Sequence, residues 1–535
     1  MDQFDYIIVG AGSAGCVLAN RLSENSANRV LLLEAGGSDR RLDVKIPLAV
    51  SKLWPNPDLT WGFFSEPEEH LDGRRLPIAR GRMLGGTSSL NGMMAIRGHA
   101  ADYDGWRDCG LPGWGWDDVL PWFRKLENHW RGEGPYHGGD GPLSVQQHPA
   151  PSPLMANAVD AARALGFPIT EDFNGERTDG FGMPDFTIQD GRRHSAADAY
   201  LRPALSRPNL EVRAHSLASR IVVRDGKARG VAYLRGDGAE REVTATREVI
   251  LSGGAINSPQ LLMLSGIGPA ADLRECGIPV LLDRAEVGAN LQDHPGAGME
   301  FELDPSLAFE HELRFDRLAL SAFRWLKRSK SVFGAPPLAI SANIATHPGS
   351  TEVDLHLLLI PLAMESRVWF PGIRRKFGPR MGAMWSLNYP RSRGWLKLRT
   401  AEPRAHPRIA FNLLSDPADR EEMLRGYHTL RTLLGQPALS GVTGRQCRPA
   451  TPLQDDEDVL AYIRATAGTA YHPSGTCRMG GDEASVVDGE LRVRGISGLR
   501  VVDASVFPRL PGGNTNLPVI MVAERAADFI RNSTE

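Results

Sequence analysis

Short apolar stretches and apolar residues at helical spacing alternate at the N-terminus and predict a βαβ unit. Residues 4–9 are mostly apolar, which is typical of a buried parallel strand, and residues 16–22 continue at helical spacing. Residues 29–34 form a second apolar stretch that ends in an acid, Glu34. A glycine-rich turn at residues 10–15 joins the first strand to the helix. This order predicts a Rossmann-like sheet.

The rest of the chain divides by pattern into regions of different character. Residues 38–150 are rich in Gly, Pro and Trp and predict long loops over a scaffold. Strand patterns return at residues 196–260 and end in a second glycine turn. Residues 296–460 contain alternating strands such as residues 353–357, which predict an antiparallel sheet. Residues 516–532 predict a final amphipathic helix.

Composition restricts the class of protein. At 535 residues the chain is long enough for two to four domains, with 42% hydrophobic residues, 23% charged residues and a net charge of −3. These values are typical of a soluble globular protein and indicate no nucleic-acid partner. Five scattered cysteines without a CxxC pair predict reduced thiols, no metal site and a cytoplasmic location. We expect no signal peptide and no spanning helix, while peripheral membrane contact stays open.

The three glycines of the first turn have separate roles in a dinucleotide fold. Gly10 allows the tight turn, Gly12 lets the backbone approach a pyrophosphate, and Gly15 lets the helix pack closely on the strand. Glu34, at the end of the second strand, is placed to accept a hydrogen bond from a ribose hydroxyl, which makes NADP an unlikely cofactor. The motif by itself does not separate FAD from NAD.

Three longer motifs resemble the signatures of one family. Residues 81–92 are similar to the first signature of the glucose-methanol-choline (GMC) oxidoreductases, and residues 254–268 are similar to the second. Residues 472–518 resemble the C-terminal active-site region of that family. The resemblance covers nearly the whole chain in the same order. It is strongest to choline-dehydrogenase-like alcohol dehydrogenases, including polyethylene glycol dehydrogenases, and to aryl-alcohol and hydroxymethylfurfural oxidases.

The resemblance implies FAD, and it implies which residues hold it. Some relatives attach FAD covalently through a histidine, but that position is Leu90 here, so noncovalent FAD is expected. No metal is implied. The implied cofactor-binding residues are Gly10, Gly12, Ser13, Ala14, Gly15, Glu34, Ala35, Trp61, Arg82, Gly85, Gly86, Ser89, Asn91, Gly92, Met93, Met94, Ala218, Asp503, Ala504, Thr515 and Asn516.

The resemblance also implies a catalytic pair. Oxidation of an alcohol sends a hydride to flavin N5 and requires a base for the hydroxyl proton, and histidine is suited to this because its ordinary pKa is near neutral. His472 aligns with the base, and Asn514 aligns with the residue that orients the developing alkoxide. His294 is a rival candidate that we interpret as part of a structural turn, and Asn516 is the alternative to Asn514. Cys477, close to the base in sequence, is interpreted as a small buried filler.

The family fold implies two domains, one of them discontinuous. The FAD-binding domain is predicted to comprise residues 1–155, 211–295 and 461–535. The substrate domain is predicted to comprise residues 156–210 and 296–460, built on the antiparallel sheet. The expected fold class is therefore α/β for the cofactor domain with an α+β substrate domain.

We interpret the protein as an enzyme that oxidises a primary alcohol with an aromatic, aliphatic or polyether body to the aldehyde. No cage for a quaternary ammonium group can be identified, so choline is not favoured. The electron acceptor, either O2 or a quinone or other carrier, is not readable from the motifs, and neither is the choice between monomer and dimer. Three alternatives stay open: a hydroxynitrile lyase with non-redox FAD, a light-driven fatty-acid decarboxylase, against which His472 argues, and a binding protein with a vestigial flavin.

Two segments of the substrate domain combine aromatic and basic residues. Residues 369–380 carry both, and the segment is interpreted as a solvated mobile loop, a lid over the pocket, a subunit contact or a membrane-surface loop. Residues 324–328 predict an amphipathic helix with Trp325 between cations.

Overall fold

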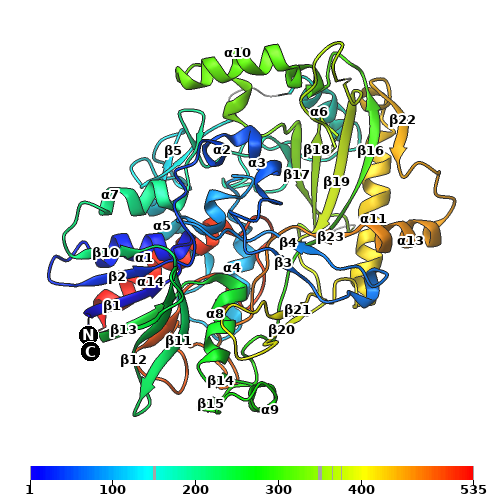
Figure 1. Cartoon of the computed structure of the whole chain (residues 1–535). Coiled ribbons are helices and arrows are strands. Elements are labelled where there is room, and N and C mark those ends of the chain that lie inside the picture. Colours follow the sequence, from blue (N-terminus) through cyan, green and yellow to red (C-terminus); the bar gives the residue numbers. More distant parts are fainter. Residues whose placement is uncertain (1, 149–151, 348–351, 364, 375, 534–535) are drawn as a thin grey trace.

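The computed structural model describes residues 2–148, 152–347, 352–363, 365–374 and 376–533. Two large sheets lie at opposite sides of the molecule, with both chain ends beside the first of them (Figure 1). The first sheet has seven strands in the order β10-β2-β1-β13-β12-β11, with β24 beside β13. Its strands are β1 Gln3–Val9, β2 Val30–Leu33, β10 Leu210–Arg213, β11 Ser216–Arg224, β12 Lys227–Arg235, β13 Glu240–Leu251 and β24 Leu499–Val501.

The predicted βαβ unit forms the centre of this sheet. β1 pairs in parallel with β2 on one side and β13 on the other, so Ile8 lies between Leu32 and Ile250. All three side chains are fully buried, as expected for a parallel strand that is covered on both faces. α1 (Ser13–Leu22) packs on β1 and on the final helix α14 (Asn516–Asn532). The predicted strands β1 and β2 and the predicted helices α1 and α14 are therefore confirmed.

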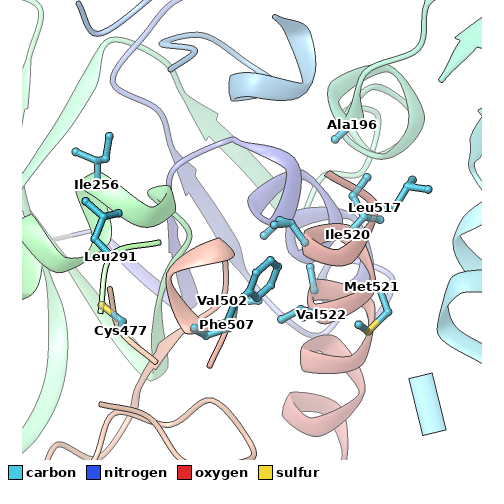
Figure 2. Close-up of a cluster of buried hydrophobic side chains, with 14 of the residues drawn as sticks. Ala196, Ile256, Leu291, Cys477, Val502, Phe507, Leu517, Ile520, Met521 and Val522 are labelled. Atoms are coloured by element: carbon cyan, nitrogen blue, oxygen red, sulfur yellow. The ribbon is translucent and has the colours of Figure 1, made fainter. Parts of the chain in front are cut away.

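A buried cluster under α14 joins the C-terminal region to the first sheet. Cys477 is fully buried at the edge of this cluster and forms no disulfide with any described cysteine. Figure 2 shows Leu517, Ile520, Met521 and Val522 on α14 and Phe507 on the segment next to this helix.

The second sheet is antiparallel, as predicted. Its order is β22-β16-β19-β18-β17-β7, with β23 beside β16. One face packs on α11 (Pro417–Leu434), where a side chain in place of Gly426 would come within 2.6 Å of Trp385. Its strands are β7 Gly180–Gly182, β16 Pro295–Leu303, β17 Ile340–Ile344, β18 Leu355–Ile360, β19 Arg380–Leu387, β22 Thr443–Arg448 and β23 Gly468–Thr469.

Residues 38–150 contain helices that the sequence pattern did not predict. α4 (Ala100–Asp108) and α5 (Trp116–Leu126) lie here, and α5 packs on α14. The apolar residues of α5 recur at helical spacing, but Pro121 and the neighbouring glycines obscured that signal. The domain boundaries proposed above stay a prediction.

The remaining elements are short or peripheral. No helix in the described ranges has the length and apolar character to cross a membrane. The other helices are α2 Leu42–Lys45, α3 Val50–Leu53, α6 Leu154–Ala164, α7 Arg202–Ala204, α8 Gly254–Leu264, α9 Ala270–Glu275, α10 Phe315–Leu326, α12 Pro437–Ser440 and α13 Asp456–Thr466. The two-stranded pairs are β3 Phe63–Phe64 with β4 Pro77–Ile78, β5 Glu127–His129 with β6 Leu143–Val145, β8 Ile188–Gln189 with β9 Arg192–Arg193, β14 Ile267–Gly268 with β15 Leu282–Asp283, and β20 Trp395–Lys397 with β21 Arg408–Ala410.

Candidate active site

A cavity of about 620 Å³ runs from the glycine turn after β1 to the wall formed by the second sheet. Four residues predicted as cofactor contacts do not line it: Gly15, Arg82, Gly85 and Ser89. The predicted site residues that do line it are Gly10, Gly12, Ser13, Ala14, Glu34, Ala35, Trp61, Gly86, Asn91, Gly92, Met93, Met94, Ala218, His472, Asp503, Ala504, Asn514, Thr515 and Asn516.

The first glycine turn is closed against the protein on one side and open to the cavity on the other. Gly10 has φ +99°, and a Cβ there would lie 2.5 Å from the carbonyl oxygen of Ser252. A Cβ on Gly15 would lie 1.9 Å from the carbonyl oxygen of Gly10, so Gly15 acts in packing. Gly12 differs, because its nearest neighbour would be 3.8 Å away. Gly12 therefore leaves open space at the N-terminus of α1, where N–H groups favour an anion.

Glu34 lies beside this turn at the end of β2. Its Oε2 accepts the N–H of Ala11 at 2.9 Å, and its Oε1 accepts the N–H of Gly36 at 2.7 Å. Burial raises the pKa of Glu34 to about 7, although both hydrogen bonds oppose this shift. Each carboxylate oxygen keeps a further lone pair, so the group can still accept a hydroxyl from the cavity side.

The backbone of the loop of residues 81–92 lies directly against the backbone of the first glycine turn. A Cβ on Gly86 would lie 2.7 Å from the Cα of Gly12, and Gly85 has φ +84°. The buried guanidinium of Arg193 fixes the end of this loop, donating to the carbonyl oxygen of Asn91 at 2.6 Å and to its Oδ1 at 2.8 Å. Gly85 and Ser89 support the loop rather than the cavity wall, since the Ser89 hydroxyl donates to Leu84 O at 2.9 Å.

Two other predicted cofactor residues have partners within the protein. The Arg82 guanidinium lies 5.1 Å from the ring centre of Trp61, which holds both side chains at the cavity edge. Asp503 accepts the N–H of Gly254 at 2.8 Å and the hydroxyl of Ser258 at 2.6 Å. Asp503 thus fixes the second glycine turn at the start of α8.

His472 and Asn514 meet in space although 42 residues separate them. Asn514 Nδ2 lies 3.3 Å from His472 Nε2. The backbone N–H of His472 donates to Asp293 Oδ1 at 2.9 Å, which fixes the turn that carries the ring. On the other side of the ring, His472 Nδ1 lies 2.9 Å from His294 Nδ1. His294 therefore touches the proposed base directly, a contact that its interpretation as a turn residue did not include.

This geometry selects one tautomer of His472. The amide Nδ2 of Asn514 can only donate, so His472 Nε2 must accept and carries no proton. The ring proton is then on Nδ1, from which it is donated to His294 Nδ1. The lone pair of His472 Nε2 is consequently directed at Asn514 Nδ2, and both residues line the cavity.

The charges around His472 keep it neutral. Burial lowers its pKa well below the ordinary value, and His294, Arg80 and His356 shift it in the same direction. Burial also lowers the pKa of His294 to about 3 and that of His356 to about 4. The Arg80 guanidinium donates to the carbonyl oxygen of Tyr471, directly before the base. At neutral pH the site therefore holds a neutral imidazole beside a fixed cation.

The far end of the cavity has mostly apolar walls. Leu358 and Ile360 of β18 and Met384 of β19 line it, and Trp54 and Tyr471 form a ring pair with centres 5.3 Å apart. Among the described residues that line the cavity, the carboxylates are those of Glu34 and Asp503, both at the glycine-turn end.

Sequence reasoning missed several residues of this cavity: Trp54, Arg80, His356 and Tyr471. Tyr471 and Arg80 could have been found, because Tyr471 adjoins His472 and Arg80 adjoins the motif of residues 81–92. Trp54 and His356 lie in segments without a recognisable motif. Nowhere in the described part of the chain do three or more His, Cys, Asp or Glu side chains form a group that could hold a metal ion.

Comparison with known proteins identifies relatives of the whole chain. Two family models described as GMC oxidoreductase match residues 4–296 and 390–523. The oxygen-dependent choline dehydrogenase of Sinorhizobium fredii is 42% identical over 99% of this chain and 95% of its own length. The structure of pyridoxine 4-oxidase from Mesorbium loti matches with a TM-score of 0.89 and 31% identity, covering 99% of this chain and 100% of its own. The structure of an Aspergillus oryzae RIB40 formate oxidase variant, with a title that refers to FAD modification, matches with a TM-score of 0.90 and 27% identity, covering 99% of this chain and 98% of its own.

Proposed function

The chain belongs to the GMC oxidoreductase family, and we propose that it oxidises an uncharged primary alcohol to the aldehyde with His472 as the base. It is an FAD-dependent alcohol oxidoreductase; the substrate class and the residue roles are the proposal. The observation that supports them is the His472–Asn514 contact in the cavity that also contains the first glycine turn. Near His472 that cavity is apolar, which suits the body of such an alcohol.

The residues of the glycine-turn end fit FAD. Open space above Gly12 at the start of α1 suits a pyrophosphate, and the Glu34 carboxylate suits a ribose hydroxyl. Asn91 to Met94 and Asn514 to Asn516 would contact the flavin end, with Leu90 leaving it noncovalent. The chemistry that bound FAD supplies is acceptance of a hydride at N5.

Within this site the side chains handle the proton of the alcohol. His472 Nε2 accepts the hydroxyl proton, because it carries no proton and its partner Asn514 Nδ2 can turn its N–H from the ring to the alcohol oxygen. His294 keeps the ring in that tautomer through Nδ1. A base with a strongly lowered pKa is weak, so the negative charge that develops on the alcohol oxygen needs a partner. Asn514 Nδ2 provides that hydrogen-bond donor.

The electrostatics at the far end of the cavity favour an uncharged substrate. The relative from Sinorhizobium fredii is named for choline, whose quaternary ammonium group carries a permanent charge. The faces of Trp54 and Tyr471 would attract a cation by about 1 kcal/mol, but Arg80 beside them repels it. A buried cation without a carboxylate in contact is costly, and none of the described residues that line this end of the cavity has one. A benzylic, aliphatic or polyether alcohol has no such penalty.

Anaerobic flavin reduction tests the proposal. FAD-loaded enzyme is mixed with benzyl alcohol, a medium-chain alkanol, a polyethylene glycol and choline, and the flavin absorbance is followed. Bleaching by an uncharged alcohol well above that by choline is the expected result. Fastest bleaching by choline would contradict the substrate class, and no bleaching by any alcohol would favour the lyase or binding-protein alternatives. On admission of air, rapid recovery of the absorbance identifies an oxidase and slow recovery a dehydrogenase with a quinone or other acceptor.

A further inference from the structure

The apolar side of α10 faces solvent. Phe315, Ala319, Phe323 and Leu326 recur every three or four residues and form one stripe along the helix. Phe315 and Leu326 are each 57% exposed and Phe323 is 55% exposed. Only two residues of the helix are buried, Ser321 and Trp325. An amphipathic helix normally turns its apolar stripe to the core, so this orientation is unusual for a surface that meets only water.

A neighbouring loop extends the apolar stripe. The N–H of Phe315 donates to the carbonyl oxygen of Trp369 at 2.9 Å, which joins the loop to the start of α10. The rings of Phe315 and Phe370 meet edge to face with centres 6.0 Å apart. Val368 and Ile373 are also exposed, the latter by 82%. We call α10 together with the described residues of 367–376 the α10 surface.

Cations surround the apolar stripe. Residues 314–330 contain six Lys or Arg and one acid, and residues 366–376 contain four Lys or Arg and no acid, in a chain whose net charge is −3. Three of these cations have acidic partners: Arg314, Arg317 and Arg328. Arg324 and Lys327 form no ion pair with any described residue, and Lys327 Nζ lies 4.5 Å from the ring centre of Phe323.

We propose that the α10 surface docks on an anionic lipid bilayer. An aromatic and aliphatic stripe flanked by long cations is the pattern that buries apolar side chains below lipid headgroups while the charges meet the phosphates. A second copy of the chain is a poorer occupant, because a symmetric contact would bring these cations against each other. The charge of the surface thus favours the bilayer over a dimer.

Docking would turn one end of the cavity towards the bilayer. Figure 1 shows α10 at the end of the molecule opposite the chain termini and close to β17. Ile360, at the end of β18, lines the cavity, and the carbonyl of the next residue, Pro361, accepts the N–H of Phe309 just before α10. A lipid-dissolved alcohol or quinone would therefore approach the site from the docked side.

Vesicle binding of the holoenzyme tests the proposal. Phosphatidylcholine vesicles with or without about one-third phosphatidylglycerol are floated with the wild type and with Phe323→Asp. The matched control is Leu281→Asp, since Leu281 is 49% exposed beside β15 at the opposite end of the molecule. Flavin reduction by a water-soluble alcohol checks that each variant is folded and loaded, independently of vesicle binding.

The expected result is flotation of the wild type and of Leu281→Asp with anionic vesicles, weakened by salt, and a loss of at least about tenfold for Phe323→Asp. Arg324→Gln with Lys327→Gln should lower the partition coefficient by about 25-fold, since each cation contributes roughly fivefold. A wild type that stays unbound overturns the proposal. So does a wild-type dimer that Phe323→Asp converts to monomer without any vesicle binding, because the surface is then a subunit interface.

Discussion

Gly12→Ala should weaken cofactor binding, whereas Gly15→Ala should destabilise the protein itself. At Gly12 the backbone angles are φ −74° and ψ −163°, which any residue adopts, and a Cβ would meet nothing within 3.8 Å. At Gly15 the Cβ would be 1.9 Å from the carbonyl oxygen of Gly10 and 3.0 Å from its carbonyl carbon. The methyl group added at Gly12 would therefore lie in the space proposed for the pyrophosphate, whereas the methyl group added at Gly15 would clash with the backbone of Gly10.

The structure sets the size of each effect. Gly15→Ala must separate α1 from the turn by about an ångström, and overpacking of this kind costs about 1–3 kcal/mol of unfolding free energy. Gly12→Ala should cost the apoprotein about 1 kcal/mol or less, because alanine is only a weaker N-cap than glycine. It should displace the pyrophosphate from one or two N–H groups, each worth about 1.5–3 kcal/mol to a charged acceptor. FAD affinity should therefore fall by roughly tenfold if one weak hydrogen bond is lost and by about 10⁴-fold if two strong ones are lost.

Two measurements on each variant separate the effects. Thermal unfolding of the apoprotein reports the packing, and titration with FAD, followed by quenching of its fluorescence, reports the affinity. Gly12→Ala should keep a near wild-type apoprotein midpoint and lose affinity, whereas Gly15→Ala should lower the midpoint. If Gly12→Ala binds FAD as tightly as the wild type, the pyrophosphate does not approach this turn and the reasoning is refuted.

Three further predictions concern the buried histidines. His472→Ala should slow flavin reduction by about 10²- to 10⁴-fold with FAD retained, and near-normal reduction would remove its role as base. The pKa of His472 is lowered and its neutral form accepts the proton, so the rate of flavin reduction should stay constant from alkaline pH down past pH 6.5. A pH profile of this rate with its midpoint above pH 6.5 would contradict the site electrostatics. His294 and His356, with pKa values of about 3 and 4, bind no proton when folded at pH 5 but do when unfolded, so acidification from pH 7 to 5 should cost about 2 kcal/mol of unfolding free energy for each. Denaturant titrations at pH 7 and pH 5 should show that His356→Gln removes the contribution of His356 to this loss of unfolding free energy. If the variant loses as much unfolding free energy as the wild type, His356 is not buried and neutral.

The parts of the fold that follow local rules were predictable from the sequence. β1, α1 and β2 combine apolar periodicity with glycines at fixed spacing, so both the elements and the space above Gly12 follow from a short segment. α4 and α5 were missed because Gly, Pro and Trp hide a helical spacing that tertiary packing enforces, as where the Trp106 ring of α4 meets the Phe507 ring with centres 5.0 Å apart.

Contacts between distant segments could not be predicted in the same way. His294 and His472 are 178 residues apart, and only the joined sheets place their Nδ1 atoms at 2.9 Å. Because that contact fixes which nitrogen of His472 is free, the chemistry of the base depends on a residue that the sequence alone assigns to a turn. A motif points to His472 as the base, but the protonation state of the ring is a property of the fold.

The choice of substrate depends on only a few side chains of the pocket. Identity of 42% to a protein named for choline shows the shared family, but it does not by itself fix the substrate. The charge preference of a pocket is decided by one or two side chains, and at the far end of this cavity β16 contributes Gly296 and Gly298, which present no polar group. The guanidinium of Arg80 lies beside Tyr471 at this end, and no carboxylate of the lining residues there would compensate the charge of a cation. Relatives can therefore share the reaction and the fold while this pocket selects, as we propose, an uncharged alcohol.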